Sequence, residues 1–493
     1  MTPYLLSKTY QKTKNQFIQG SKLTSSTKDK QDSEDKPIKR KKISSSNNSD
    51  KNESSKKNGK SKNERSKIAD LSNISSLDNK ELVKIAKEKK IKENPKDRSD
   101  LVNMLVAIEA EEKNATIGAG ILDILPDQFG FLRPPGQKNS PNDIHVSRSI
   151  IRKNKLRQGD FVLAQIDFPE EGGSQRYPGA INVEAVNGYS VEQIEKRVNF
   201  DKFTSIYPNE QIILENEPKV MSSRIIDLVS PIGKGQRALI VAPPKAGKTI
   251  LLKDIANSIE KNSPEIKLIV ALIGERPEEV TDMRRSVKGE VFSSTFDEPV
   301  EDHCKTSETA LERARRLVES GENVVLLLDS LTRLGRAYNI AVPSSGKTLS
   351  GGMDPYALYP PKKFFGAARN CEEGGSLTII ATALVDTGSR LDDLIYEEFK
   401  GTGNMELHLD RGLAERRIWP AINIEKSGTR HEELLQNETT LGKITQIRRI
   451  MAAFPSDNNE KTWTEKIVDG LKAAKGNQDF LDNMQAYLQD QKD

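Results

Sequence analysis

Near-continuous apolar runs separated by helical patterns fill the second half of the chain. Such runs cover residues 237–242, 266–274, 323–329 and 377–384. Runs of this kind are typical of parallel strands buried on both faces, whereas a stretch such as residues 307–319 has apolar positions at helical spacing. The alternation predicts an α/β nucleotide-binding domain over residues 223–493.

The pattern differs in the residues before this domain. Residues 67–117 carry apolar positions at helical spacing, which predicts a module of two or three helices. Residues 118–190 contain five short or alternating apolar runs separated by Gly, Pro, Asn and Asp: 121–125, 129–132, 144–146, 161–166 and 180–183. This is typical of a small antiparallel barrel. We expect residues 191–222 to be a linker.

Residues 1–66 lack the apolar content of a folded domain. They hold ten apolar residues, and 17 Lys and Arg against seven Asp and Glu. Such a segment buries too little apolar surface to offset its chain entropy, so we predict a disordered basic tail. Its run of four cations at residues 39–42 could be a nuclear import signal, an RNA-contacting arm or part of a solvated low-complexity tail.

A phosphate-binding loop follows the first apolar run of the α/β domain. The sequence Ala-Pro-Pro-Lys-Ala-Gly-Lys-Thr at residues 242–249 stands between a predicted strand and a predicted helix, although Ala242 replaces the usual first glycine. Backbone N–H groups of such a loop surround phosphate oxygens, a lysine reaches the β and γ phosphates, and a hydroxyl binds Mg²⁺. We therefore predict ATP and Mg²⁺ as cofactors, held by Pro244, Lys245, Ala246, Gly247, Lys248, Thr249 and Ile250.

Two further apolar runs end in carboxylates. Asp329 ends one run, which is the Walker B arrangement for a carboxylate that holds the Mg²⁺ shell. Glu275 follows another run, and the carboxyl end of a parallel strand is where ligands bind, so Glu275 is the candidate for polarising the attacking water. Glu278 and Glu279 are expected to be solvated residues in the first turn of a helix, where the helix dipole favours acids.

The predicted barrel carries two aromatic residues at alternate positions. Phe129 and Phe131 share one face of a strand next to Arg133. Two such rings can both be core residues, or they can form a platform on which bases stack. The adjacent arginine, the barrel pattern and the later sequence Gln-Arg-Tyr at residues 175–177 favour binding of single-stranded nucleic acid.

Several motifs together resemble the bacterial transcription termination factor Rho family, over roughly residues 67–493. They lie at residues 230–236, 242–249, 275–280, 288–291, 294–297, 364–370, 397–404 and 427–430. The resemblance implies a RecA-like P-loop ATPase domain preceded by an OB-fold, cold-shock-like barrel. It also implies a cytoplasmic homohexamer that translocates 5′ to 3′ on single-stranded RNA, unwinds RNA–DNA hybrids and releases transcripts from RNA polymerase, whose elongation complex and elongation factors are then partners.

The same resemblance implies roles for individual residues. In the nucleotide site, Arg430 matches an arginine finger that reaches a neighbour's γ phosphate, Arg333 a second interface arginine, and Trp419 an aromatic packed on adenine; we add Arg276 to this site. Lys347 and Arg390 match cations of two loops that line a central pore. The primary RNA site would comprise Phe129, Phe131, Arg133, Asp143, His145, Gln175, Arg176 and Tyr177. Two of these, His145 and Gln175, stand where Tyr and Glu are familiar in the family.

Composition excludes several other classes of protein. No stretch approaches 18 consecutive apolar residues, so we expect no transmembrane helix and no membrane partner. Two cysteines and four histidines cannot build a disulfide framework or a zinc site together. Three functions stay open: an ATP-driven RNA translocase, a rotary-ATPase or RecA-type subunit that does not use RNA, and a passive RNA-binding protein. The aromatic barrel argues against the second, and Glu275 with Arg430 against the third.

Overall fold

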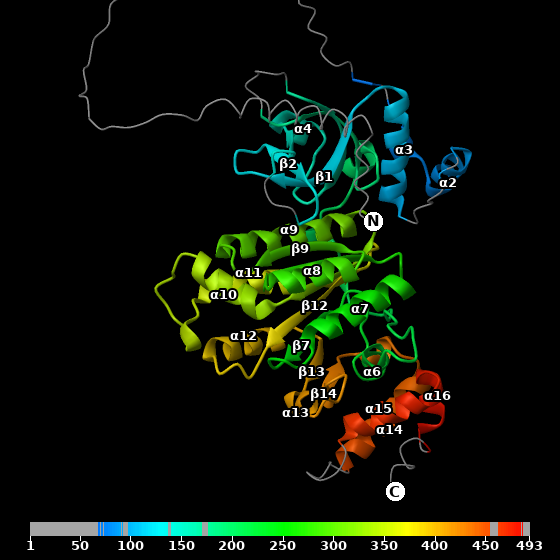
Figure 1. Ribbon diagram of the computed structural model, residues 1–493, viewed down its shortest axis with the longest axis vertical. Helices are drawn as coiled ribbons and strands as arrows, with labels where there is room; N and C mark the ends of the chain where they lie inside the picture. The colour runs from blue at the N-terminus through cyan, green and yellow to red at the C-terminus, as the bar shows by residue number, and fades with distance from the viewer. Residues whose placement is uncertain are drawn as a thin grey trace, which may run out of the picture.

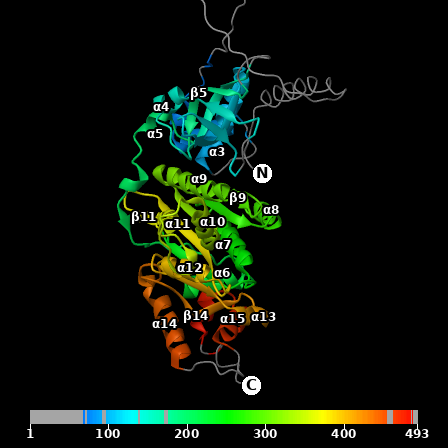
Figure 2. The same cartoon turned by 90° about the vertical axis from the view of Figure 1, so that its left-hand side faces the viewer.

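The computed structural model describes residues 68–69, 71, 73–89, 91, 97–136, 140–169, 176–453, 462–484 and 486. The predicted tail over residues 1–66 and Gln175 lie outside the described residues. Figures 1 and 2 show a barrel with its helices at one end of the molecule, a layered α/β body in the middle and the C-terminal helices at the other end.

Two helices pack against the outside of the barrel. A short 3₁₀ turn, η1 (Ile74–Ser76), precedes α2 (Asn79–Glu88) and α3 (Arg98–Glu112). The side chain of Asp78 accepts the N–H of Glu81 while the Glu81 carboxylate accepts the N–H of Asp78, a capping box that starts α2. Leu82 and Leu105 are fully buried with barrel residues such as Leu163.

Five strands close the barrel in the order β1-β2-β3-β5-β4. They are β1 (Ile117–Ile124), β2 (Gly130–Arg133), β3 (Ile144–Val146), β4 (Phe161–Asp167) and β5 (Gly179–Val186), with α4 (Arg148–Lys153) between β3 and β4. This order is that of an OB-fold. The predicted barrel is confirmed with one difference, because β3 pairs with β5 in parallel. Because α4 and β4 lie between β3 and β5 in the chain, these two strands are not joined by a hairpin.

The chain then runs along the α/β body. Residues 191–222 contain α5 (Val191–Glu195), η2 (Phe200–Lys202), β6 (Ser205–Ile206) and the start of α6 (Met221–Val229). Phe200 is fully buried in one core cluster of the α/β body, and Ile212 and Leu214 are buried in the other. This segment therefore holds the barrel against the body instead of merely joining the two.

The α/β body is built on a mostly parallel sheet in the order β14-β13-β7-β12-β10-β8-β9. The parallel strands are β7 (Arg237–Ala242), β8 (Lys267–Glu275), β9 (Glu290–Thr295), β10 (Asn323–Asp329), β12 (Ser376–Leu384) and β13 (Met405–Leu409). Antiparallel β14 (Ile422–Thr429) forms one edge, and β11 (Arg369–Cys371) pairs with β12 and β6. The four predicted strands are confirmed; β9, β13 and β14 were not predicted.

Helices cover both faces of this sheet. In β10, Val324, Leu326 and Leu328 face one core cluster while Val325 and Leu327 face the other, which is why the run is apolar at every position. One cluster includes residues of α9 (Val300–Glu319), α10 (Leu331–Ala341), α11 (Pro355–Phe365) and α12 (Arg390–Lys400). The opposite cluster includes residues of α6, α7 (Lys248–Asn262), α8 (Pro277–Ser286), α14 (Glu438–Ala453), α15 (Trp463–Ala473) and α16 (Asn477–Asp482).

Short elements complete the chain: η3 (Ser350–Gly352), α13 (Arg411–Glu415) and η4 (Glu432–Leu434). Among the described residues, none of the helices has both the length and the apolar character needed to cross a membrane.

Candidate functional site

The phosphate-binding loop lies between the end of β7 and the start of α7. Lys245 and Gly247 have φ values of 66° and 87°, and Gly247 is the residue before the first turn of α7. A Cβ on Gly247 would lie 2.6 Å from Cζ3 of Trp419, so glycine is required for both backbone conformation and space. The first N–H groups of α7 are thereby directed toward the loop, as a phosphate site needs.

Lys248 brings the two predicted carboxylates together. Its Nζ lies 2.5 Å from Oδ1 of Asp329 and 2.9 Å from Oε1 of Glu275. The carboxylates meet because β8 and β10 are neighbouring parallel strands that end at the same edge of the sheet. Both are almost fully buried, so their charges act in a low dielectric.

Burial and neighbouring charges shift the pKa values of Lys248 and Glu275. Burial alone would lower the pKa of Lys248, but the charges of Asp329 and Glu275 outweigh it and raise that pKa. Burial, followed by the charge of Asp329, raises the pKa of Glu275 above its ordinary value, with Lys248 opposing. A carboxylate with a raised pKa is a better proton acceptor, as a residue that activates water requires.

Oxygen ligands suited to Mg²⁺ gather beside the lysine. Thr249 donates its hydroxyl to Oε2 of Glu279 at 3.0 Å, and Thr382 donates its hydroxyl to Oδ1 of Asp329 at 2.7 Å. Mg²⁺ in phosphate sites takes a few protein oxygens together with phosphate and water, which this donor set fits. Glu279 is half-buried, so the expectation of a solvated side chain was wrong, whereas Glu278 is exposed. Glu275 ends β8 and α8 begins at Pro277, so no local pattern in the sequence distinguished Glu279 from a solvated residue of the first turn.

The predicted arginines differ in their surroundings. Arg333, on α10, donates to the carbonyl oxygen of Gly274, and its Nη2 lies 3.4 Å from Oε2 of Glu275. Arg276, which precedes α8, is exposed at the same edge of the sheet, as is Ile250 in the first turn of α7. Arg333 therefore contacts Glu275 of its own chain.

Arg430 lies at the opposite end of the sheet. It follows β14, and its backbone N–H donates to the carbonyl oxygen of Asn404. The backbone N–H of Asn404 in turn donates to the carbonyl oxygen of Arg237, which starts β7. The phosphate loop follows Ala242 at the other end of β7, about 17 Å away at roughly 3.3 Å per residue. The exposed Arg430 side chain therefore cannot reach the phosphate loop of its own chain.

Trp419 lies over the phosphate loop. The residue is 41% exposed, and its ring contacts the position of Gly247. A cavity of about 250 Å³ adjoins the ring and is lined by residues that include Ile418, Glu465 and Lys472. A flat, half-exposed ring next to the phosphates is suited to packing against a base.

Four rings gather on the outer face of the barrel. The ring centroid of Phe131 lies 5.9 Å from that of Phe129, 5.8 Å from that of His145 and 5.0 Å from that of Tyr177. None of the four belongs to the barrel's core cluster, into which the alternate residue Leu132 points. Arg176, beside Tyr177, is exposed.

Arg133 is held between carboxylates beneath these rings. Its Nε donates to Oδ2 of Asp143 at 2.7 Å, its Nη1 donates to Oδ2 of Asp123, and its Cζ lies 5.2 Å from the ring centroid of Phe131. Both Arg133 and Asp143 are buried. The structure therefore joins Arg133, Asp143 and the rings in one place, and it adds Asp123, which the sequence did not single out.

The two predicted pore loops lie against each other; the first is residues 342–352, which include Lys347, and the second is residues 387–391, which include Arg390. A Cβ on Gly351 would lie 2.6 Å from the backbone N of Leu391, next to Arg390. Asp354 anchors the first loop by accepting the N–H of Ser345 at 2.6 Å, which leaves Lys347 exposed.

A buried aspartate anchors the second loop. Asp392 accepts the hydroxyl of Thr387 at 2.6 Å and two N–H groups of Arg336. Arg336 lies on α10, the helix that follows Asp329. This helix therefore connects the second loop to the nucleotide site.

Comparisons with known proteins match both domains of the chain to family models. The family model of the ATP synthase alpha/beta nucleotide-binding domain matches residues 222–429, and that of the Rho termination factor RNA-binding domain matches residues 118–192. Among solved structures, an ATPase from the type III secretion system of pathogenic bacteria is similar over 58% of this chain and 88% of its own, at 24% identity and a TM-score of 0.49.

Curated relatives cover most of the chain. A transcription termination factor Rho from Bacillus subtilis is 54% identical over 405 residues, which span 82% of this chain and 93% of that one. The one from Chromobacterium violaceum is 53% identical over 78% of this chain and 92% of its own, and the one from Streptomyces lividans is 55% identical over 74% and 51%. With its P-loop ATPase domain and RNA-binding barrel, the chain is an RNA-dependent ATPase that acts in transcription termination, and it belongs to the transcription termination factor Rho family.

Proposed function

We propose that the chain assembles into a homohexameric ring in which ATP, bound between neighbouring subunits, is hydrolysed to pull single-stranded RNA through the central pore. The observation that carries this proposal is the position of Arg430, at the end of the sheet opposite its own phosphate loop. An exposed arginine there can complete only a neighbour's site. A finger supplied in trans ties hydrolysis to the ring interface.

Within one subunit, each group of the nucleotide site has a distinct role. Lys248 places its charge on the phosphates when ATP displaces it from the carboxylates, and Glu275 orients the attacking water and accepts its proton. Mg²⁺, held by Thr249 and Asp329, would neutralise charge on the β and γ phosphates. Trp419 packs on adenine. Residues 244–250, with Arg276 and Arg333, surround the rest of the nucleotide.

RNA would be bound at two places. The barrel, which we take as residues 118–190, loads the transcript by stacking bases on Phe129 and Phe131, with the remaining residues supplying polar contacts: Arg133, Asp143, His145, Gln175, Arg176 and Tyr177. In the α/β domain, residues 223–493, Lys347 and Arg390 bind the RNA backbone in the pore. Arginine at position 390 adds a planar fork to the charge. The helical module (residues 67–117) and the linker (residues 191–222) hold the two domains together.

The partners follow from this cycle. Release of a transcript requires contact with the RNA polymerase elongation complex and its elongation factors, in the cytoplasm where transcription occurs. The relatives' names support transcription termination as the process.

The decisive experiment measures the ATPase rate with no RNA and with each homopolymer RNA. We expect hydrolysis to rise strongly with RNA, and the four rates to reveal the base preference set by His145 and Gln175. Lys248→Ala serves as the blank for contaminating ATPases. Equal hydrolysis with and without RNA would favour a rotary-ATPase or RecA-type subunit, and no hydrolysis at all would favour a passive RNA-binding protein.

A further inference from the structure

The barrel docks on α9 in two different ways along the helix. At the C-terminal end, buried Glu319 lies 3.0 Å from Arg157, 3.5 Å from Arg197 and 3.0 Å from Arg316, and it accepts the N–H of Phe200. Buried ion pairs close the contact at this end. Toward the N-terminal end, by contrast, a cavity of about 350 Å³ separates the two domains.

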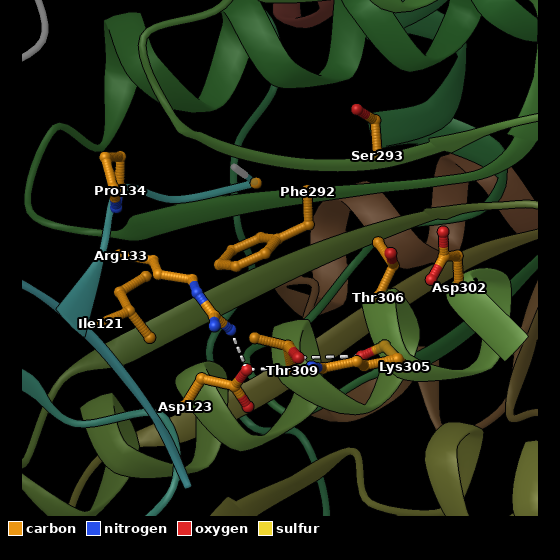
Figure 3. A pocket seen from close by; sticks show the side chains of 11 residues that line it. Ile121, Asp123, Arg133, Pro134, Phe292, Ser293, Asp302, Lys305, Thr306 and Thr309 are labelled. Atoms are coloured by element: carbon orange, nitrogen blue, oxygen red, sulfur yellow. Dashed lines mark hydrogen bonds and ion pairs between the residues drawn. The ribbon is translucent and has the colours of Figure 1, made fainter. Parts of the chain in front are cut away.

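An ion pair between the two domains borders this cavity. Nζ of Lys305, on α9, lies 2.9 Å from Oδ2 of Asp123, on barrel strand β1. Figure 3 shows Asp123 between Arg133 on the barrel side and Lys305 on the helix side, with Phe292 and Thr306 among the residues that line the space.

Both cations share one carboxylate oxygen. Oδ2 of Asp123 accepts from Nη1 of Arg133 and lies 2.9 Å from Nζ of Lys305, while Oδ1 accepts from Gln158 at 3.1 Å. The side chain of Asp123 is 10% exposed and that of Lys305 is 52% exposed. Two cations on one oxygen compete for its charge, so each is held less tightly than it would be alone.

Arg133 belongs to the RNA-binding face of the barrel. It lies under the ring of Phe131 and is paired with Asp143. To donate to an oxygen of RNA, its guanidinium must give up part of its contact with Asp123. A residue that weakens the Arg133–Asp123 pair therefore makes Arg133 more available to RNA.

We infer that Lys305 is a positioning residue of the RNA site, supplied by the motor domain through Asp123. Docking of the barrel on α9 brings Lys305 to Asp123 and releases Arg133 toward RNA; binding of RNA to Arg133 leaves Asp123 to Lys305 and strengthens the docking. The two effects have the same sign, as linkage requires. The inference rests on the proposed role of Arg133 in RNA binding.

Lys305→Met in the full-length protein tests it. The probe is a labelled pyrimidine oligonucleotide of about ten nucleotides, within the site size of one OB-fold. We expect Kd to rise about two- to fivefold, the range for a half-exposed ion pair. Lys305→Arg should restore the wild-type Kd. Lys261→Met is the matched control, because Lys261 is 53% exposed and pairs with Glu217 at 2.7 Å, away from the barrel.

A double-mutant cycle with Asp123→Asn identifies the route. If Lys305 acts through Asp123, Lys305→Met has no effect on Kd once Asp123 is neutralised. An unchanged Kd in Lys305→Met would overturn the inference. So would an effect of equal size in the Asp123→Asn background, or a loss of about one from the slope of log Kd against log salt, since both indicate that Lys305 touches phosphate directly.

Failure of the proposed function would look different. In that case the wild-type chain would not bind the oligonucleotide, or Phe131→Ala would bind it as tightly as the wild type does. A wild-type chain that binds RNA normally, with Lys305→Met indistinguishable from it, overturns only the role of Lys305.

Discussion

Arg430→Ala should stop ATP hydrolysis without removing nucleotide binding. Arg430 lies beside Arg237 at the start of β7, and the phosphate loop begins after Ala242, about 17 Å along the strand. Because this separation exceeds the reach of an arginine side chain, the residue can act only on another subunit's nucleotide. Removal of an arginine finger costs about 10³- to 10⁵-fold in kcat.

Mixing two inactive variants separates action in trans from action in cis. Lys248→Ala retains its finger but loses its phosphate lysine, and Arg430→Ala retains the lysine but loses the finger. In a ring assembled at random from equal amounts, about one interface in four joins an intact finger to an intact phosphate loop, because each interface takes one half-site from each neighbour.

The assay is RNA-stimulated phosphate release from subunits mixed before the ring assembles, over a series of ratios. We expect activity to be highest near equal amounts and absent at both ends of the series. The reasoning would be refuted by mixtures that stay inactive at every ratio while an affinity tag on one variant co-purifies the other, since Arg430 would then serve its own subunit's site.

Three further outcomes follow from the geometry. Phe131→Ala should weaken RNA binding by about 1–3 kcal/mol through lost stacking and leave ATP affinity unchanged; equal RNA affinity by fluorescence anisotropy would show that the ring is only structural. Because burial and Asp329 raise the pKa of Glu275, and the base must be deprotonated, the rate should rise with pH through a midpoint above the ordinary glutamate value of 4.5. A pre-steady-state pH profile that is flat above pH 5 would contradict this. Glu319→Gln should destabilise the protein by about 1–3 kcal/mol in urea unfolding, because it removes a buried charge that Arg157, Arg197 and Arg316 share, although Arg197 keeps its pair with Asp160; exposed Glu217→Gln is the control, and equal midpoints for both would refute the argument.

Most of the candidate nucleotide site was accessible from the sequence. The phosphate loop is a contiguous motif, and Asp329 and Glu275 each end an apolar run, so their common edge follows from the rule that parallel strands share one direction. The sequence did not predict that Glu279 belongs to the nucleotide site. Its type and position fit a solvated helix start equally well, and only the approach of α7 to α8 turned it toward Thr249.

The proposed RNA-binding face was predicted in part. Alternation along residues 129–133 predicted that Phe129 and Phe131 face the same side, and their ring centroids lie 5.9 Å apart. The sequence could not show that Arg133 is held by Asp123 and Asp143, because an arginine on a strand has many possible partners.

The sequence by itself determined the parallel sheet, the closed barrel and the phosphate loop, because strand burial and loop chemistry are written in local patterns of residue type. The tertiary structure alone decided which charges meet: Lys305 with Asp123 across the domain boundary, Glu319 with three arginines, and Arg430 far from its own phosphate loop. The physical reason is that apolar burial is set by periodicity along the chain, whereas an ion pair depends on the relative placement of elements far apart in sequence.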